Sequence, residues 1–198
     1  MRTFSTSLAS LAASLACALM VFSSSAALAG LVATASIGAA IPSLEQFDTT
    51  LDGDSGYSIG GSLGMRFGDM IQWDTAELSY QSADQNDIFL GQYTSSALTI
   101  GTGIRLGMFG DDSKFHPYVS FGLGGSRDNF ESGGLDVITE WGFEWNAGGG
   151  ILFDVTDSVS VGARYRYRSN SFDEAFGVPI SEVTIGVHNI SFEIAFGG

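Results

Sequence analysis

The stretch 158–168, which reads SVSVGARYRYR, constrains the fold of this chain more than any other segment. Its residues alternate strictly between two kinds. One set is apolar and comprises Val159, Val161, Ala163, Tyr165 and Tyr167. The intervening set is small or basic and ends in Arg164, Arg166 and Arg168. Because successive side chains of a strand point to opposite faces, this pattern predicts a strand with one apolar and one guanidinium-bearing face. Either the arginines face water on a soluble sheet, or the apolar face meets lipid and the arginines point into a barrel.

Residues 1–29 have the features of a secretory signal peptide. Arg2 supplies a positive start, residues 8–22 are largely apolar, and Ala27-Leu28-Ala29 is an A-x-A cleavage site. We therefore expect a signal peptide over 1–29 and one barrel domain over 30–198. The sole cysteine, Cys17, falls in the signal peptide, so the mature chain is expected to have no disulfide and no thiolate metal site.

The predicted mature chain is strongly acidic. Loss of Arg2 leaves 7 basic residues against 22 acidic ones, a net charge of −15. Such acidity argues against nucleic acid as a partner. No run of about 18 apolar residues follows the signal peptide, so no spanning helix is expected. Export without a spanning helix leaves two classes, a secreted β-protein and an outer-membrane β-barrel.

Eight segments have strand patterns long enough to cross a membrane, for which tilted strands need about 9–11 residues. The predicted strands are 31–41, 57–67, 71–81, 94–108, 118–127, 141–153, 158–169 and 184–196. Short links over 68–70 and 154–157, with a somewhat longer turn over 109–117, alternate with longer polar links over 42–56, 82–93, 128–140 and 170–183. Short turns at one end and long loops at the other are typical of outer-membrane barrels.

Within each predicted strand, large apolar residues share one face and small or charged residues share the other. In 57–67 the two faces are Ile59, Leu63, Met65 and Phe67 against Ser58, Gly60, Ser62, Gly64 and Arg66. In 71–81 they are Ala76, Leu78 and Tyr80 against Thr75, Glu77 and Ser79. A soluble barrel places its large apolar residues inside, whereas this composition favours an apolar exterior and a polar lumen. We therefore predict an all-β, eight-stranded antiparallel up-and-down transmembrane barrel in the outer membrane.

The polar faces of these strands carry a set of charges that would share the lumen. The set is Arg66, Glu77, Arg105, Glu144, Arg164, Arg166, Arg168 and Glu193. Buried charges must be paired, and an eight-stranded barrel is just wide enough for side chains to fill. We therefore predict an ion-paired plug, with the excess of arginine offset by further acceptors, ordered water or solvated ends.

Aromatic residues near the ends of the predicted strands are candidates for interfacial girdles, where amphipathic rings sit at the headgroup level. They are Trp73, Tyr80, Trp141, Trp145, Tyr165 and Tyr167. Core packing would explain any one of them, and a bilayer better explains the set.

Residues 148–167 combine a glycine-rich strand, a short turn around Thr-Asp and a strand that ends in Tyr-Arg-Tyr. This segment resembles the small outer-membrane barrels of Gram-negative bacteria, namely OmpA-like membrane domains and the opacity-type "porin family" proteins. Residues 76–80, 116–124 and 188–196 are similar to the third, fifth and closing strands of that family. The resemblance implies insertion by the outer-membrane assembly machinery and contact with outer-membrane lipid and lipopolysaccharide.

Two features depart from the family pattern. The family usually ends on an aromatic residue, whereas here Gly197 and Gly198 follow Phe196, which puts efficient recognition by the assembly machinery in doubt. We expect no periplasmic peptidoglycan-binding domain after the barrel, so the resemblance does not imply the cell-wall tethering of longer members.

The predicted long links are acidic and have Arg127 as almost their only counterweight. Their carboxylates are Glu45, Asp48, Asp52, Asp54, Asp84, Asp87, Asp128, Glu131, Asp136, Glu140, Asp173, Glu174 and Glu182. Carboxylate oxygens are ligands for hard cations, so divalent-cation binding, bridging to lipopolysaccharide phosphates, is one interpretation. The other is a solvated, repulsive rim.

The two histidines offer little for catalysis. His116 adjoins a predicted turn, and His188 precedes Ser191 by three residues. Odd spacing puts those two side chains on opposite faces of a strand, which does not suit a nucleophile and its base. We therefore expect no enzyme, cofactor or metal site. The predicted role is structural or surface interaction, in envelope integrity or adhesion with an unidentified ligand, and the alternative is a narrow porin-like channel for small solutes.

Overall fold

The computed structural model describes residues 30–46, 49–52, 55–87, 91–110, 113–132, 135–175 and 178–197, so the predicted signal peptide lies outside the described residues. Nine strands form one antiparallel sheet in the order β2-β1-β3-β4-β5-β6-β7-β8-β9. The strands are β1 (Leu31–Gln46), β2 (Thr49–Asp52), β3 (Gly56–Phe67), β4 (Ile71–Asp87), β5 (Gly91–Gly107), β6 (Phe115–Ser132), β7 (Leu135–Thr156), β8 (Val159–Ala175) and β9 (Val178–Phe196). Among the described residues, no helix is long and apolar enough to span a membrane.

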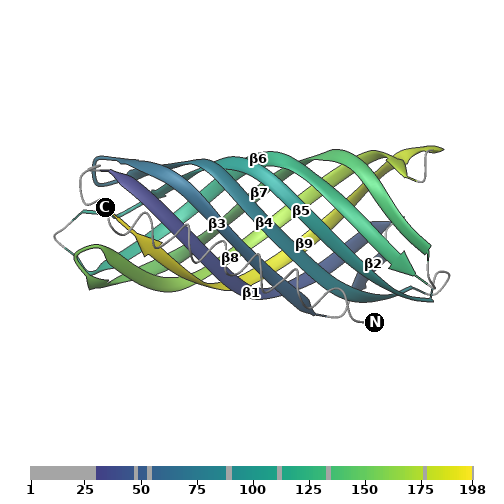
Figure 1. The fold of residues 1–198 in the computed structure, drawn as a ribbon, viewed down its shortest axis with the longest axis horizontal. Coiled ribbons are helices and arrows are strands. Elements are labelled where there is room, and N and C mark those ends of the chain that lie inside the picture. Colours follow the sequence, from purple (N-terminus) through teal and green to yellow (C-terminus); the bar gives the residue numbers. More distant parts are fainter. Residues whose placement is uncertain are drawn as a thin grey trace.

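The sheet closes on itself because β1 pairs with β9 as well as with β3 (Figure 1). The closing register runs from Ala33 opposite Phe196 to Glu45 opposite Thr184. Eight tilted strands therefore form the wall, which confirms the predicted fold class. Closure also removes the open sheet edges that would otherwise leave backbone groups unpaired.

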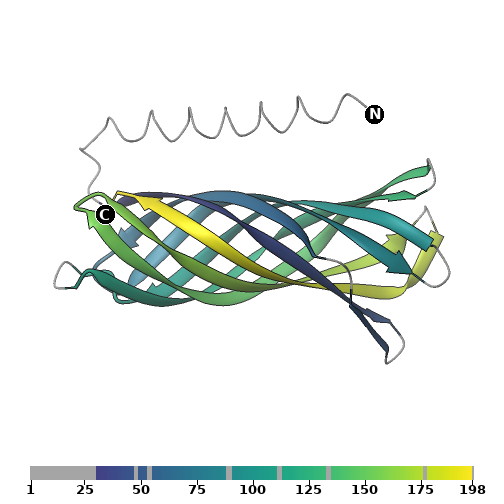
Figure 2. The same ribbon diagram turned by 90° about the horizontal axis from the view of Figure 1, so that it is seen from below.

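The ninth strand, β2, is a short hairpin partner of β1 that the sequence did not predict. It pairs with β1 from Ser43 opposite Asp52 to Gln46 opposite Thr49. In Figure 2 this hairpin projects away from the end of the barrel. The prediction of an unpaired link over 42–56 is therefore wrong for this part of the chain.

The wall strands extend well past the predicted ones at the end away from the short turns. β7 begins at Leu135 rather than at Trp141, and β9 begins at Val178 rather than at Thr184. Most of the carboxylates assigned to long links therefore lie on strands. The side-chain pattern that marked the strands ends where one face ceases to be apolar, whereas backbone pairing continues between neighbouring strands beyond that level.

The opposite end of the barrel is held by tight turns. Gly68 adopts a positive φ of 64° in the turn between β3 and β4, a conformation that glycine adopts without steric cost. Neighbouring turns are also linked, because Phe109 donates its backbone N–H to Asp69 O at 2.6 Å and Asp154 donates to Lys114 O at 3.0 Å. The ends of the described barrel, residues 30 and 197, hydrogen-bond to this same end.

A β-bulge in β4 changes which side chains face the lumen. Leu63 pairs with Ala76 and Gly64 with Asp74, so Thr75 is an extra residue. Strand parity therefore switches within β4. Trp73 and Leu78 both face outward although one position is odd and the other even, and Thr75 is exposed. The predicted inward orientation of Thr75 is wrong for this reason.

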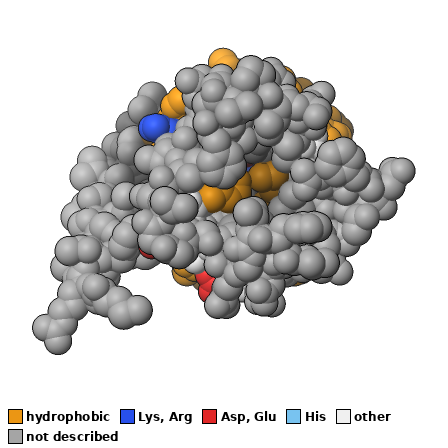
Figure 3. Space-filling view, turned by 90° about the vertical axis from the view of Figure 1, so that its right-hand side faces the viewer, with side chains coloured by type: hydrophobic (Ala, Val, Ile, Leu, Met, Phe, Trp, Pro, Cys, Tyr) orange, Lys and Arg blue, Asp and Glu red, His pale blue; other side chains and the backbone are white. Residues whose placement is uncertain are grey.

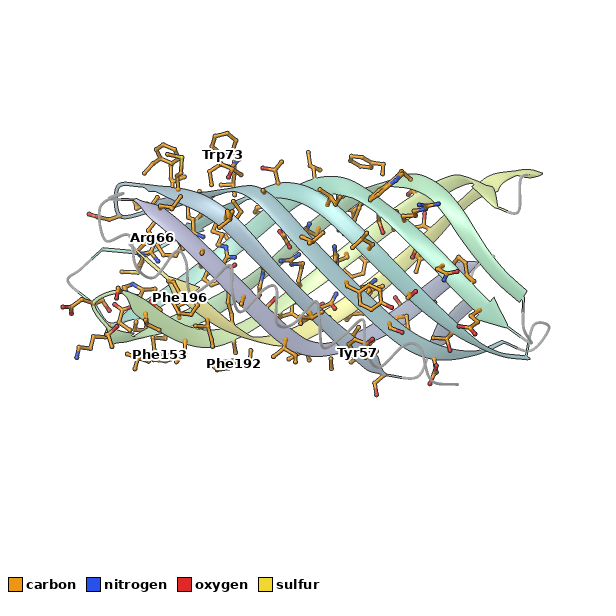
Figure 4. All side chains as sticks on the ribbon, viewed as in Figure 1. Tyr57, Arg66, Trp73, Phe153, Phe192 and Phe196 are labelled. Atoms are coloured by element: carbon orange, nitrogen blue, oxygen red, sulfur yellow. The ribbon has the colours of Figure 1, made fainter. Side chains whose placement is uncertain are left out.

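The remaining wall strands alternate as predicted between an apolar exterior and a polar lumen. On β6, the outward Phe121 and Leu123 are 59% and 56% exposed, whereas the inward Ser120 on the same strand is 2% exposed. Figure 4 shows Trp73, Phe153 and Phe192 projecting outside the barrel outline while charged groups occupy its interior. A soluble protein of this size would not expose such a continuous belt of large apolar side chains.

Candidate functional site

The structure places all eight charged residues predicted for the lumen on the inner wall. Seven of them are buried, and Arg66, near the short turns, is half-buried. They do not form one uniform network. The lumen instead contains a sequence of small clusters, each assembled from strands that lie far apart in the chain.

Arg105 on β5 organises the first cluster. Its Nε donates to Asp74 Oδ2 at 2.7 Å, and its Nη1 donates to Glu193 Oε1 on β9. The guanidinium lies over the ring of Tyr118 at 5.1 Å, and Tyr118 donates its hydroxyl to Glu193 Oε2 at 2.7 Å. Gln72 completes the cluster by donating to Asp74 Oδ1 at 2.8 Å. Each charge is thus compensated by a buried partner of opposite sign or by a hydrogen bond.

Asp74 is the principal lumen residue that the sequence reasoning missed. It reaches the interior because the bulge after it shifts the parity of β4, which lets both Asp74 and Glu77 point inward. The signal is present in the sequence. Trp73 lies on the odd positions of this strand, whereas Leu78 and Tyr80 lie on the even ones, and such a switch within one strand marks a bulge.

The reach of Tyr118 depends on a glycine on the neighbouring strand. A Cβ added at Gly150 would lie 2.6 Å from the Tyr118 hydroxyl oxygen and 2.7 Å from Ala163 O. Gly150 is paired with Tyr118 across β6 and β7 and with Arg164 across β7 and β8. The glycine-rich segment of β7 therefore provides the space that bulky lumen side chains from its neighbours occupy.

Arg168 forms the second well-paired cluster, nearer the extended end of the barrel. Its Nε and Nη2 both donate to Glu144 Oε1, at 2.9 and 2.8 Å, and its Nη1 donates to Ser79 Oγ at 2.7 Å. Thr99 donates its hydroxyl to the other oxygen of Glu144 at 2.8 Å. Between this cluster and that of Arg105, Arg166 pairs with Glu77.

Arg164 differs from the other lumen arginines. It is buried, yet within the described part of the chain it forms no ion pair, and its Nε has no hydrogen-bond partner. Arg166 and Arg105 repel it, whereas Glu77 and Glu193 attract it. This arginine therefore depends on longer-range attraction, because both nearby carboxylates are already bound by another guanidinium.

A small polar cavity lies beside Arg166. It has a volume of about 20 Å³, and Glu77, Arg168 and Asn189 are among the residues that line it. Both side-chain polar atoms of Asn189 are buried and lack a partner among the described residues. A cavity of this size with several polar partners is large enough for a bound water.

Apolar side chains occupy the lumen at both ends of the charged section. At the short-turn end the cluster comprises Val32, Phe109, Tyr118, Leu152 and Ala195. At the extended end it comprises Ala40, Ile185 and Val187, with Phe130 packed against them. Figure 3, which faces the extended end, shows apolar side chains in the central hollow. The two apolar clusters therefore border the charged section and touch it, because Tyr118 hydrogen-bonds Glu193 and Val187 is paired with Arg168.

Asp128 was predicted to lie in a long loop, but the structure places it on a strand. It lies on β6, is 5% exposed, and accepts a hydrogen bond from Asn170 Nδ2 at 2.6 Å. Parity explains its placement, because Ser126 and Asp128 continue the inward face of β6 past the predicted strand end at Arg127. Asp74 is thus one of the further acceptors that the excess of lumen arginine requires, whereas Asp128 accepts hydrogen bonds from the neutral side chains of Asn170 and Ser126.

The histidines lie in two separate environments. His116 is buried at the short-turn end, where its ring nitrogens contact Met108 O at 2.6 Å and Asp154 Oδ2 at 2.7 Å. His188 faces outward, where Nδ1 lies 2.8 Å from the Tyr165 hydroxyl oxygen. Ser191 pairs with Arg164 on the other face of the wall. The two side chains considered for catalysis are therefore separated by the barrel wall.

The predicted girdle residues all have outward side chains. Trp145, Tyr165, Tyr167 and His188 form a continuous aromatic cluster across β7, β8 and β9, with ring centroids 5.1–6.0 Å apart. Trp73 lies nearer the short turns and donates its indole N–H to Thr102 Oγ1 at 3.0 Å. Trp141 is exposed, and Tyr80 is half-buried at the extended end.

The described part of the chain has no evident metal-binding site. No group of three or more histidine, cysteine, aspartate or glutamate side chains is arranged there to hold an ion. The carboxylates of the Arg105 and Arg168 clusters instead accept hydrogen bonds from guanidinium groups.

Comparison with known proteins supports the architecture. The family model described as "Outer membrane protein beta-barrel domain" matches residues 9–196. Neisserial surface protein A (NspA) is similar with a TM-score of 0.61 and 18% identity, over 86% of this chain and 98% of that one. Ail of Yersinia pestis gives a TM-score of 0.48 at 14% identity, over 85% and 100%. The outer membrane enzyme PagL gives 0.44 at 17% identity, over 82% and 99%. None of the curated protein sequences matches significantly.

At 18% identity the likeness to NspA shows the fold alone, and identities this low carry no activity from one barrel to another. The family match extends over nearly the whole chain and agrees with the closed barrel, its apolar belt and its charged lumen. The chain therefore belongs to the outer membrane β-barrel family and is an eight-stranded protein of the outer membrane.

Proposed function

We propose that this protein is a closed barrel with a structural or surface-interaction role, in envelope integrity or adhesion. The observation that carries the proposal is the packing of the lumen. The ion-paired clusters of Arg105 and Arg168 and the two apolar clusters that border them occupy the lumen, so the interior supports the wall rather than a path for solutes. Function is then expected on the outward surface and at the extended end, which faces the cell exterior in barrels of this type.

Planar-bilayer recordings test the closed state. The purified protein is expected to insert without unitary conductance, because ions would have to displace the ion pairs and the apolar clusters that border them. A trimeric porin inserted under the same conditions is the positive control. Steady unitary currents from the wild-type protein would contradict the closed state.

Charge removal at the cell-surface end tests the interaction role. Asp84 and Glu131 are exposed on β4 and β6 near that end, and Asp157 is an exposed carboxylate in a short turn at the other end. A strain that carries Asp84→Asn and Glu131→Gln is expected to lose attachment or resistance to bile salts, whereas Asp157→Asn should behave as wild type. If a deletion strain and both variants match wild type in the two assays, the proposal is wrong.

A narrow channel for small solutes is the second candidate. The polar cavity beside Arg166 and the partnerless atoms of Asn189 and Arg164 favour it, because hydrated space in the charged section is what a rearranging pathway would need. Unitary conductance that disappears on substitution of Arg164 or Glu193 would favour this candidate over the closed scaffold.

A further inference from the structure

An outward-facing groove near the cell-surface end of the wall has only Glu131 in common with the residues that test the function proposed above. It has a volume of about 440 Å³ and runs over β5 between β4 and β6. Its lining combines an aromatic pair, hydroxyl groups, one base and two acids. The residues are Tyr57, Tyr80, Ser82, Thr94, Ser96, Leu98, Arg127, Asp128, Asn129 and Glu131. We call this feature the rim groove.

The rim groove is continuous with the lipid-facing belt. Along the outer face of β5, Ile104, Ile100 and Leu98 are exposed apolar residues, and the smaller, polar Ser96 and Thr94 follow them. Apart from Thr102, which accepts a hydrogen bond from the indole of Trp73, the outward side chains of β5 therefore change from apolar to hydroxyl-bearing beyond Leu98. Such a change marks the level at which acyl chains give way to headgroups in the outer leaflet.

Charge singles out this groove on the outer surface. The sequence has 8 basic residues, of which Arg2 lies in the predicted signal peptide and five lie in the lumen. Lys114 is exposed at the short-turn end, which leaves Arg127 as the one outward-facing base near the cell-surface end. Arg127 is therefore the guanidinium that this end of the outer wall offers to an anion, and it shares the groove with the carboxylates of Asp128 and Glu131.

The other walls of the groove suit a sugar. The rings of Tyr57 and Tyr80 lie 6.2 Å apart, and aromatic faces of this kind pack against the apolar faces of pyranose rings. Asn129 Oδ1 is buried without a hydrogen-bond partner among the described residues, so it can accept a hydrogen bond from a hydroxyl group of an occupant.

We propose that the rim groove binds the phosphorylated saccharide headgroup of an outer-leaflet glycolipid, with a phosphate at Arg127 and a sugar against Tyr57 and Tyr80. Arginine suits this role because its planar donors match phosphate oxygens. The proposal goes beyond the role in envelope integrity or adhesion and does not depend on whether the lumen conducts. Binding here would fix one side of the barrel to its surrounding lipid.

The test measures binding of purified lipopolysaccharide to the folded protein in detergent micelles, with EDTA present, from the midpoint of the heat-induced gel shift. Phosphorylated lipopolysaccharide is expected to raise the midpoint, and Arg127→Gln should weaken the apparent affinity by about tenfold. Lys114→Gln, which removes the other exposed base, is the matched control and should bind as wild type. Ser96→Trp, designed to fill the groove floor, should abolish the shift.

Three outcomes would overturn the proposal. The first is equal affinity for the Arg127→Gln and Lys114→Gln variants. The second is equal binding of enzymatically dephosphorylated lipopolysaccharide. The third is binding that appears only with Mg²⁺ and ignores Arg127, which would assign the contact to carboxylates such as Glu131. The retained gel shift of each variant without lipid shows that it is folded, so a negative result reports on the groove and leaves the conductance tests untouched.

Discussion

The regions of the lumen around Arg105 and around Arg164 each contain a buried guanidinium, but the two groups differ in the carboxylates that contact them. Arg105 is 1% exposed and contacts two carboxylates, whereas Arg164 is 6% exposed and contacts none within the described chain. The partners of Arg105 come from β4 and β9, and a β-bulge delivers one of them. The comparison shows that the stabilising effect of a lumen arginine depends on the placement of its partners rather than on burial itself.

The largest expected effect comes from removing Arg105. Arg105→Leu leaves Asp74 and Glu193 buried without their cation, which should lower the free energy of unfolding by about 3–5 kcal/mol. Urea titration of the protein in detergent micelles, followed by tryptophan fluorescence, measures it. Adding Glu193→Leu to this variant should recover part of the loss, because one unpaired carboxylate is removed. A loss below about 1 kcal/mol would contradict the assigned role of this cluster.

A smaller loss is expected in the second paired cluster. Glu144→Gln keeps the shape of the side chain but removes the charge that binds Arg168 and accepts from Thr99. Loss of charge-assisted hydrogen bonds should cost about 2–3 kcal/mol in the same urea titration. Ser79→Ala, which removes only a neutral acceptor from the same guanidinium, is the control and should cost less.

Filling the space beside Tyr118 should have a smaller effect again. Gly150→Ala introduces a methyl group within 2.6 Å of the Tyr118 hydroxyl oxygen, so the bond from Tyr118 to Glu193 must lengthen or break. Such overpacking should cost about 1–2 kcal/mol. The double variant Gly150→Ala with Tyr118→Phe is expected to lose less than the sum of the single changes, and strict additivity would show that the two sites are independent.

The smallest effect is expected from removing Arg164. Arg164→Leu removes a buried guanidinium whose nearby carboxylates are already paired, so the free energy of unfolding should change by less than about 1 kcal/mol in either direction. Because Arg105→Leu makes the same chemical change in the same lumen, the two variants form a matched pair. Equal losses for the two would remove the distinction between the regions.

Strand parity predicted a large part of the lumen correctly. Residues such as Glu77, Arg166 and Glu193 lie inside because alternation on a strand needs only local information. The parity rule gave the wrong orientation for Thr75 because one extra residue in β4 inverts the pattern. Asp128 was assigned to a loop because the predicted strand stopped at Arg127, whereas β6 continues past its apolar section. Both errors concern where a strand pattern starts, ends or shifts.

The partners inside the lumen were beyond the reach of the sequence. Arg105 and Glu193 are separated by 88 residues along the chain, and Arg166 and Glu77 by 89. Which carboxylate meets which guanidinium depends on the register of every strand between them. The lone Arg164 and the position of the rim groove across β4, β5 and β6 depend on the same registers.

The period-two pattern by itself determined that this chain forms a barrel with an apolar exterior and a charged lumen. The alternating residues of each strand define its apolar and its polar face. In lipid, only a closed barrel provides a hydrogen-bond partner for every backbone group of such strands. Only the tertiary structure decided the ion-pair partners, the inward turn of Asp74 and the position of Arg164, which forms no ion pair among the described residues. These features arise when β1 meets β9, because closure sets the stagger that brings distant strands into contact across the lumen.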